Sequence, residues 1–97
     1  MSTYIVLINF TDQGIHNVKQ SPERAKALTA AAEKHGIKLK DRYWTMGAYD
    51  GVVVFDAPNE EAITTWALSV GSQGSIRTQT LRAFSPDEMN TMLAKLP

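Results

Sequence analysis

Two short apolar runs constrain the fold of this chain most strongly. Tyr4–Phe10 reads YIVLINF and Val52–Phe55 reads VVVF, and the only polar residue in either run is Asn9. Successive side chains of a strand point to opposite faces, so both faces of these two segments are apolar. Strands of this kind lie in the middle of a sheet that is covered on both sides. The sequence therefore predicts two central strands.

Capping residues predict three helices between and after these strands. Ser21 and Pro22 are suited to open the first helix as N-cap and first helical residue, and Gly36 is suited to end it. Asn59 is the predicted N-cap of the second helix. Ser85–Glu88 has the pattern of a capping box with proline at the first helical position, which predicts a third, C-terminal helix.

Two further segments read as edge strands. The first, Ile37–Thr45, alternates between apolar and basic residues, and its lysines discourage pairing with another strand edge. The alternation predicts that Ile37, Leu39 and Tyr43 share one face. The second, Ser75–Phe84, is more polar than the two central runs.

The predicted order is strand, helix, strand, strand, helix, strand, followed by the third helix. With right-handed crossovers, this order folds most simply as a ferredoxin-like α+β sandwich, with the first and third strands in the centre of an antiparallel sheet. These are the two strands that are apolar on both faces. We expect residues 1–97 to form one domain of this kind.

Both crossover helices of such a fold cover the same face of the sheet. The other face would then be a large apolar patch, which is rare on a stable monomer. The C-terminal helix is too short to cover four strands. We therefore expect a homodimer, or a higher homo-oligomer, whose subunits pack sheet against sheet.

Composition limits the kinds of partner. Ten basic and ten acidic residues cancel, so the chain has no overall charge to attract nucleic acid or an anionic membrane. There is no cysteine, and the N-terminus runs into the first strand without a basic segment or a cleavage site. We expect a cytoplasmic protein with no nucleic-acid or membrane partner.

The turn between the second and third strands is the best candidate site. Gly47 and Gly51 bracket Tyr49 and Asp50, and Tyr43 and Trp44 precede the turn. One reading makes Tyr49 and Asp50 catalytic, with a carboxylate holding a phenol that moves a proton or orients a substrate. The other reading is structural: Asp50 caps the turn while Tyr49 packs on Trp44.

Two further residues are candidates for ligand chemistry. His16 follows a central strand and is a candidate base, although a solvated loop histidine is the simpler reading. Arg77 is suited to bind a carboxylate or phosphate, or to form an ion pair with Asp41 or Asp50. The predicted ligand-binding residues are thus Tyr43, Trp44, Tyr49, Asp50 and Arg77. The chain has no metal-ligand motif and no phosphate-binding loop, so we expect no metal and no cofactor.

Four separated strings of this sequence resemble the GYD domain family. They are FTDQG at Phe10–Gly14, KQSP at Lys19–Pro22, YWTMGAYD at Tyr43–Asp50 and RTQTLRAF at Arg77–Phe84. The residues that match the family's name are Gly47, Tyr49 and Asp50. The resemblance implies a ferredoxin-like fold of the dimeric α/β-barrel type.

Barrels of this type carry out several functions, so the resemblance leaves open a purely structural assembly and two functional hypotheses. The first is an oligomeric small-molecule-binding or sensory module. The second is a cofactor-independent oxygenase or isomerase that uses Tyr49, Asp50 and His16.

Overall fold

The structure, a computed structural model, describes all 97 residues. It confirms the predicted ferredoxin-like α+β fold with an added C-terminal helix. None of the helices combines the length and the apolar character needed to cross a membrane. In chain order the elements are β1 (Ser2–Phe10), α1 (Asp12–His16), a 3₁₀ turn (Val18–Gln20), α2 (Ser21–Glu33), β2 (Lys38–Trp44), β3 (Gly51–Ala57), α3 (Glu60–Gly71), β4 (Ile76–Ala83) and α4 (Pro86–Leu93).

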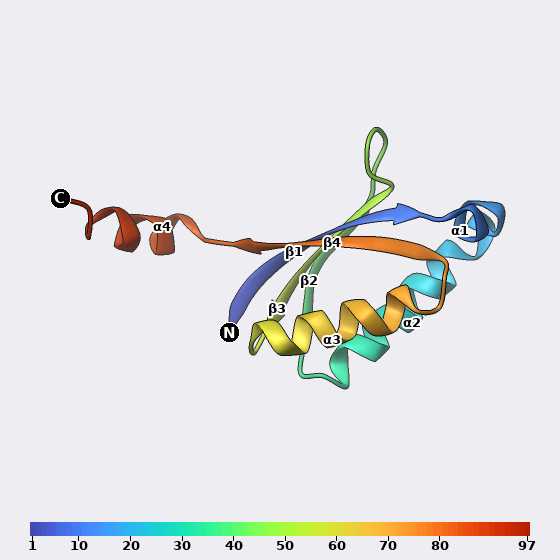
Figure 1. Cartoon of the computed structure of the whole chain (residues 1–97), viewed down its shortest axis with the longest axis horizontal. Coiled ribbons are helices and arrows are strands. Elements are labelled where there is room, and N and C mark those ends of the chain that lie inside the picture. Colours follow the sequence, from blue (N-terminus) through green and yellow to red (C-terminus); the bar gives the residue numbers. More distant parts are fainter.

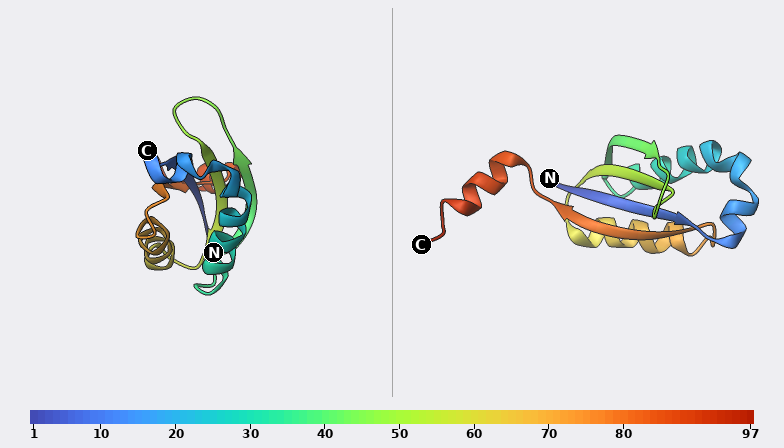
Figure 2. Two further views of the ribbon diagram at one scale, coloured as in Figure 1. Left: turned by 90° about the vertical axis from the view of Figure 1, so that its right-hand side faces the viewer. Right: turned by 90° about the horizontal axis from the view of Figure 1, so that it is seen from above.

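The four strands form one antiparallel sheet in the order β2-β3-β1-β4. As predicted, β1 and β3 are central, and Val6 of β1 lies opposite Val53 of β3. Helices α2 and α3 lie side by side on one face of the sheet, and the other face is bare (Figures 1 and 2). We call these the covered face and the open face.

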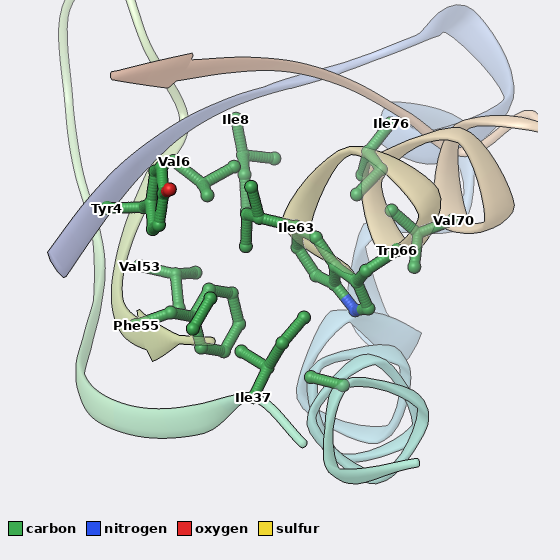
Figure 3. Close-up of a cluster of buried hydrophobic side chains, with 12 residues drawn as sticks. Tyr4, Val6, Ile8, Ile37, Val53, Phe55, Ile63, Trp66, Val70 and Ile76 are labelled. Carbon is green, nitrogen blue, oxygen red and sulfur yellow. The ribbon is translucent and has the colours of Figure 1, made fainter. Parts of the chain in front are cut away.

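The hydrophobic core lies between the covered face and the two helices (Figure 3). At its centre, the rings of Phe55 and Trp66 meet edge to face with centroids 4.9 Å apart. The indole nitrogen of Trp66 donates to the carbonyl oxygen of Leu28 at 3.0 Å, so the buried N–H is satisfied and α3 is tied to α2. The buried cluster consists of Tyr4, Val6, Ile8, Ala32, Ile37, Val53, Phe55, Ala57, Ile63, Trp66, Val70 and Ile76.

The open face carries the alternate residues of the same strands. Strand register places a row of aliphatic side chains across its centre, with polar residues around them. These side chains are half-buried by their neighbours in the sheet, or exposed in the case of Leu81, and no helix covers them. The aliphatic row consists of Ile5, Leu7, Val52, Val54 and Leu81.

Helix α4 extends away from the body of the domain (Figures 1 and 2). Its start is built as predicted: the Ser85 side chain accepts from the Glu88 N–H, and the Glu88 carboxylate accepts from the Ser85 N–H. Arg82 at the end of β4 forms an ion pair with Glu88 at 3.3 Å. The apolar side chains of this segment are exposed; they are Met89, Met92, Leu93 and Leu96.

The predicted alternation along β2 is wrong at one point. A β-bulge between Leu39 and Asp41 shifts the register, so Leu39 and Arg42 share the covered face while Tyr43 lies on the open face. Ile37 is buried but lies before the strand. An extra residue in one strand reverses the faces of all that follow it, and nothing in the alternating pattern announces it.

The segment between β1 and α2 also differs from the prediction. Residues predicted as a loop form the short helix α1, whose N-cap is Thr11, and His16 is its last residue. The N-cap of α2 is Gln20 instead of Ser21, because the 3₁₀ turn runs directly into the helix and Ser21 already has helical dihedral angles.

Candidate functional site

The loop between β2 and β3 projects from the sheet on its open side (Figure 1). Gly47 has a φ of 101°, a conformation that side chains disfavour, so the glycine fits the turn's geometry. Thr45 closes the base of the loop: its N–H donates to the Asp50 carbonyl oxygen at 2.9 Å and its hydroxyl donates to that of Tyr49 at 2.6 Å. The loop is therefore held by its own hydrogen bonds.

Asp50 joins this loop to the end of β1. Its carboxylate Oδ2 accepts from the N–H of Phe10 at 2.8 Å, and its own N–H donates to the Ile8 carbonyl oxygen at 2.8 Å. The ladder between β1 and β3 ends at the pair Ile8 and Gly51, so the carboxylate satisfies the first N–H beyond it. This contact favours the structural reading of Asp50. The group that the carboxylate binds lies in β1, however, and not in the turn as predicted.

Tyr49 reaches across the sheet to the opposite edge. Its hydroxyl donates to Gln79 Oε1 on β4 at 3.0 Å. Arg77 lies two residues before Gln79 and shares its face, opposite Asn9 of β1. The ion pairs of the structure do not include Arg77, and its side chain is exposed.

The remaining candidates lie apart from this group. His16 is exposed at the end of α1. Trp44 lies at the end of β2, half exposed, with the Arg42 guanidinium 6.0 Å from its ring centroid. The structure therefore does not bring His16, Tyr49, Asp50 and Arg77 together around one cavity. No group of three His, Cys, Asp or Glu residues is close enough to hold a metal ion.

A cavity of about 100 Å³ lies on the covered side, between α2, α3 and the sheet. Apolar residues form most of its wall, including Ile8, Leu28, Val53 and Trp66. Of the predicted ligand-binding residues, Trp44 and Asp50 contribute to its lining, and so does Tyr43, although its place in the register is on the open face. Tyr49 and Arg77 belong to the open side.

Sequence reasoning missed the two arginines that line this cavity. Arg24 of α2 is satisfied by backbone: Nη1 donates to the Asn17 carbonyl oxygen and Nη2 to that of Gly14. Arg42 of β2 uses one nitrogen, Nη1, to donate to the Ala25 carbonyl oxygen at 3.0 Å and to Thr29 Oγ1 at 2.8 Å. Only the bulge turns Arg42 inward, so the alternating pattern placed it on the wrong face.

The string FTDQG has a structural role in this fold. The Thr11 hydroxyl accepts from the Gly14 N–H and donates to the Gly74 carbonyl oxygen. A Cβ on Gly14 would lie 1.9 Å from the Ser75 carbonyl oxygen, so no larger residue fits without movement of the backbone. These contacts fasten α1 to the turn between α3 and β4.

Comparison with known protein families identifies the family of this chain. The model of the GYD domain matches residues 4–93. The chain belongs to the GYD domain family. This GYD domain has its glycine in the projecting loop, its tyrosine bonded across the open face and its aspartate bonded to β1.

Individual relatives agree with this assignment. The GYD domain is 34% identical over 84 residues to the "glutamine synthetase and cystathionine beta-lyase binding protein" of Thermus thermophilus, covering 86% of this chain and 88% of the relative. The crystal structure of TTHA0845 from Thermus thermophilus superposes with a TM-score of 0.56 and 25% identity, covering 88% and 95% of the two chains. FFRP-DM1 shares the fold, with a TM-score of 0.62 and 19% identity over 87% of this chain and 100% of the other.

Proposed function

We propose that this GYD domain is a homo-oligomeric, small-molecule-binding module of the sensory kind. The observation that carries the proposal is the mostly apolar cavity between α2 and the sheet, which has Asp50 and Arg42 in its wall. Ligand sites are commonly concave and apolar, with a few polar groups that set orientation. The cavity has this composition.

Binding is favoured over catalysis by the engagement of the two best catalytic candidates. The Asp50 carboxylate holds a backbone N–H, and the Tyr49 hydroxyl donates to Gln79. A general acid or base needs its reacting atom within reach of a substrate proton. Both residues instead stabilise the loop that borders the open face.

Self-association is supported by two exposed apolar surfaces. The open face has the aliphatic row in the centre of the sheet. Helix α4, which extends away from the domain, exposes methionine and leucine side chains. A second copy packed sheet to sheet would bury the first surface and bring α4 beside a neighbour. We propose this arrangement in a cytoplasmic protein, with no nucleic-acid or membrane partner.

A protein partner is a second candidate function. The relative from Thermus thermophilus is named for binding glutamine synthetase and cystathionine beta-lyase. At 34% identity across most of both chains, we propose that this GYD domain also binds a metabolic enzyme of one of these two kinds. Pull-down with each purified enzyme tests this, and no retention of either enzyme would contradict it.

The small-molecule function is tested by filling the cavity. Ala25 of α2 is buried at the cavity wall, whereas Ala30 of the same helix is exposed. Compounds that raise the melting temperature of the parent should lose that effect in Ala25→Leu and keep it in the control Ala30→Leu, because ligand binding stabilises only the folded state. Equal responses in both variants would remove the cavity from the proposal.

A further inference from the structure

Arg42 is a half-buried cation with unused hydrogen-bonding capacity at the edge of an apolar cavity. Of its three guanidinium nitrogens, Nη1 makes both hydrogen bonds, to Ala25 and Thr29. Nε and Nη2 have no partner in the chain, and none of the ion pairs includes Arg42. No buried side-chain nitrogen or oxygen of the structure lacks a partner, so these two nitrogens are accessible from outside and can donate to a ligand.

Asp50, the acidic residue in the cavity wall, does not pair with Arg42. Asp50 lines the same cavity, but its Oδ2 accepts from the Phe10 N–H and it forms no ion pair with Arg42. Arg24 differs from Arg42, because backbone carbonyl oxygens satisfy both of its terminal nitrogens. Arg42 is thus the cation in this cavity that has two adjacent nitrogens, Nε and Nη2, left for a ligand.

We infer that the cavity binds a small monocarboxylate with an apolar body, whose carboxylate pairs with Nε and Nη2 of Arg42. An arginine edge presents two parallel N–H donors that match a carboxylate. The ligand's apolar body would lie among Ile8, Leu28, Val53 and Trp66. The inference rests on the proposed small-molecule function and adds the ligand's chemical class.

Charge and size narrow the ligand further. The charged residues in the cavity wall are Arg24, Arg42 and Asp50, whose charges sum to +1. A monoanion balances this charge, whereas a dianion such as phosphate would leave an excess negative charge. An apolar cavity of about 150 Å³ takes up benzene. The cavity here, at about 100 Å³, suits a smaller apolar body of about four to five carbons, with the carboxylate at the cavity edge.

The test compares a carboxylic acid with its uncharged counterpart of the same shape. The probes are 4-methylpentanoate and 4-methylpentanamide, titrated at pH 7 and followed by tryptophan fluorescence and calorimetry. Trp66 and Trp44 both line the cavity, so occupation should change their emission. We expect the acid to bind at least tenfold more tightly than the amide, and inorganic phosphate and acetate to produce no comparable signal.

Variants assign this preference to Arg42. Arg42→Gln should reduce the acid's affinity at least tenfold and leave the amide unchanged, and Arg42→Lys should retain part of the preference because it keeps the charge. The control is Lys34→Gln, which removes an exposed cation from the end of α2 and should change neither affinity. Circular dichroism establishes that each variant is folded, and the acid–amide comparison on the parent protein needs no variant.

Each outcome separates this inference from the function on which it rests. Equal binding of acid and amide would overturn the assignment of a carboxylate and leave a small-molecule cavity standing. Tighter binding of phosphate than of the acid would overturn the monocarboxylate class. If neither acid nor amide binds at millimolar concentration, the inference is wrong, and the Ala25→Leu comparison then decides whether the cavity binds other compounds.

Discussion

The same strands form both faces of the sheet, yet helices bury only one of the two faces. On the covered face, Val53 is 6% exposed and Val6 is fully buried, because α2 and α3 pack over them. On the open face, Val52 and Val54 have only their neighbours in the sheet for cover. The difference shows that the apolar composition of a strand does not by itself decide whether a face of the sheet is covered within the chain.

The largest effect is expected on the covered face. Val6→Asp places a carboxylate in the core opposite Val53 and Thr80, with no cation across from it, which costs several kcal/mol and is enough to unfold a domain whose total stability is about 5–15 kcal/mol. Circular dichroism should show a loss of cooperative melting. A variant that melts within a few degrees of the parent would mean that this face is not the core.

Val54, on the open face of β3, sharpens the comparison. Val54→Asp places the same charge on the open face, where water can solvate it in the single chain, so the domain should stay folded. In the proposed oligomer the charge would be buried between two sheets, and we expect association to weaken about a hundredfold, or about 2.7 kcal/mol. Sedimentation velocity at micromolar concentration provides the measurement.

The isosteric control at this position is Val54→Thr, which adds no charge and should weaken association much less. If Val54→Asp leaves the oligomer intact, the interface lies elsewhere. A parent protein that sediments as a monomer would rule out the sheet-to-sheet arrangement altogether.

An intermediate effect is expected where the projecting loop meets β1. Asp50→Asn removes the charge from the hydrogen bond to the Phe10 N–H, and charge-assisted bonds of this kind contribute about 1.5–3 kcal/mol. The free energy of unfolding should fall by about 1 kcal/mol, since the amide oxygen can still accept the bond.

Arg77→Gln serves as the partner in a double-mutant cycle. Because Arg77 forms no ion pair with Asp50, the two effects should add within about 0.5 kcal/mol. A larger coupling energy from thermal melts would show that the two side chains act as a pair.

The smallest effect concerns α4, which belongs to neither face. The Ser85 N–H and the Arg82 side chain stabilise the charged form of Glu88, and the pKa of that carboxyl is lowered. Its contribution to the helix is therefore complete above about pH 4.3, the usual glutamate value. It should be lost as the pH falls through the lower pKa of the folded state.

Far-UV circular dichroism and the NMR shift of Glu88 follow this transition. We expect α4 to lose helicity at acid pH while β1 and β3 stay paired. The matched variant Glu88→Gln should abolish this step. A Glu88 titration at or above the ordinary glutamate pKa would contradict the capping box.

Much of the fold could be predicted because its signals are local. The two-sided apolar runs identified β1 and β3 as central strands, Asn59 capped α3 through its side chain, and the Ser85–Glu88 capping box formed as expected. Each signal is a property of residues within a few positions of one another. The strand order then followed from chain connectivity and the right-handed crossover rule.

The candidate site was harder to predict because its contacts join distant segments. The sequence singled out Tyr49 and Asp50, but their partners, Gln79 and Phe10, lie 30 and 40 residues away. The pattern placed Arg42 on the wrong face, since the bulge that turns it inward leaves no local trace.

The sequence by itself determined the four strands and the three longer helices, and that one sheet would have two apolar faces. Only the tertiary structure decided that Asp50 binds β1, that Arg42 enters an apolar cavity and that α4 extends away from the domain. The physical reason is the distance along the chain over which each kind of interaction acts. Periodicity and capping act within a turn or two, whereas hydrogen-bond partners, cavities and exposed faces depend on how distant segments meet.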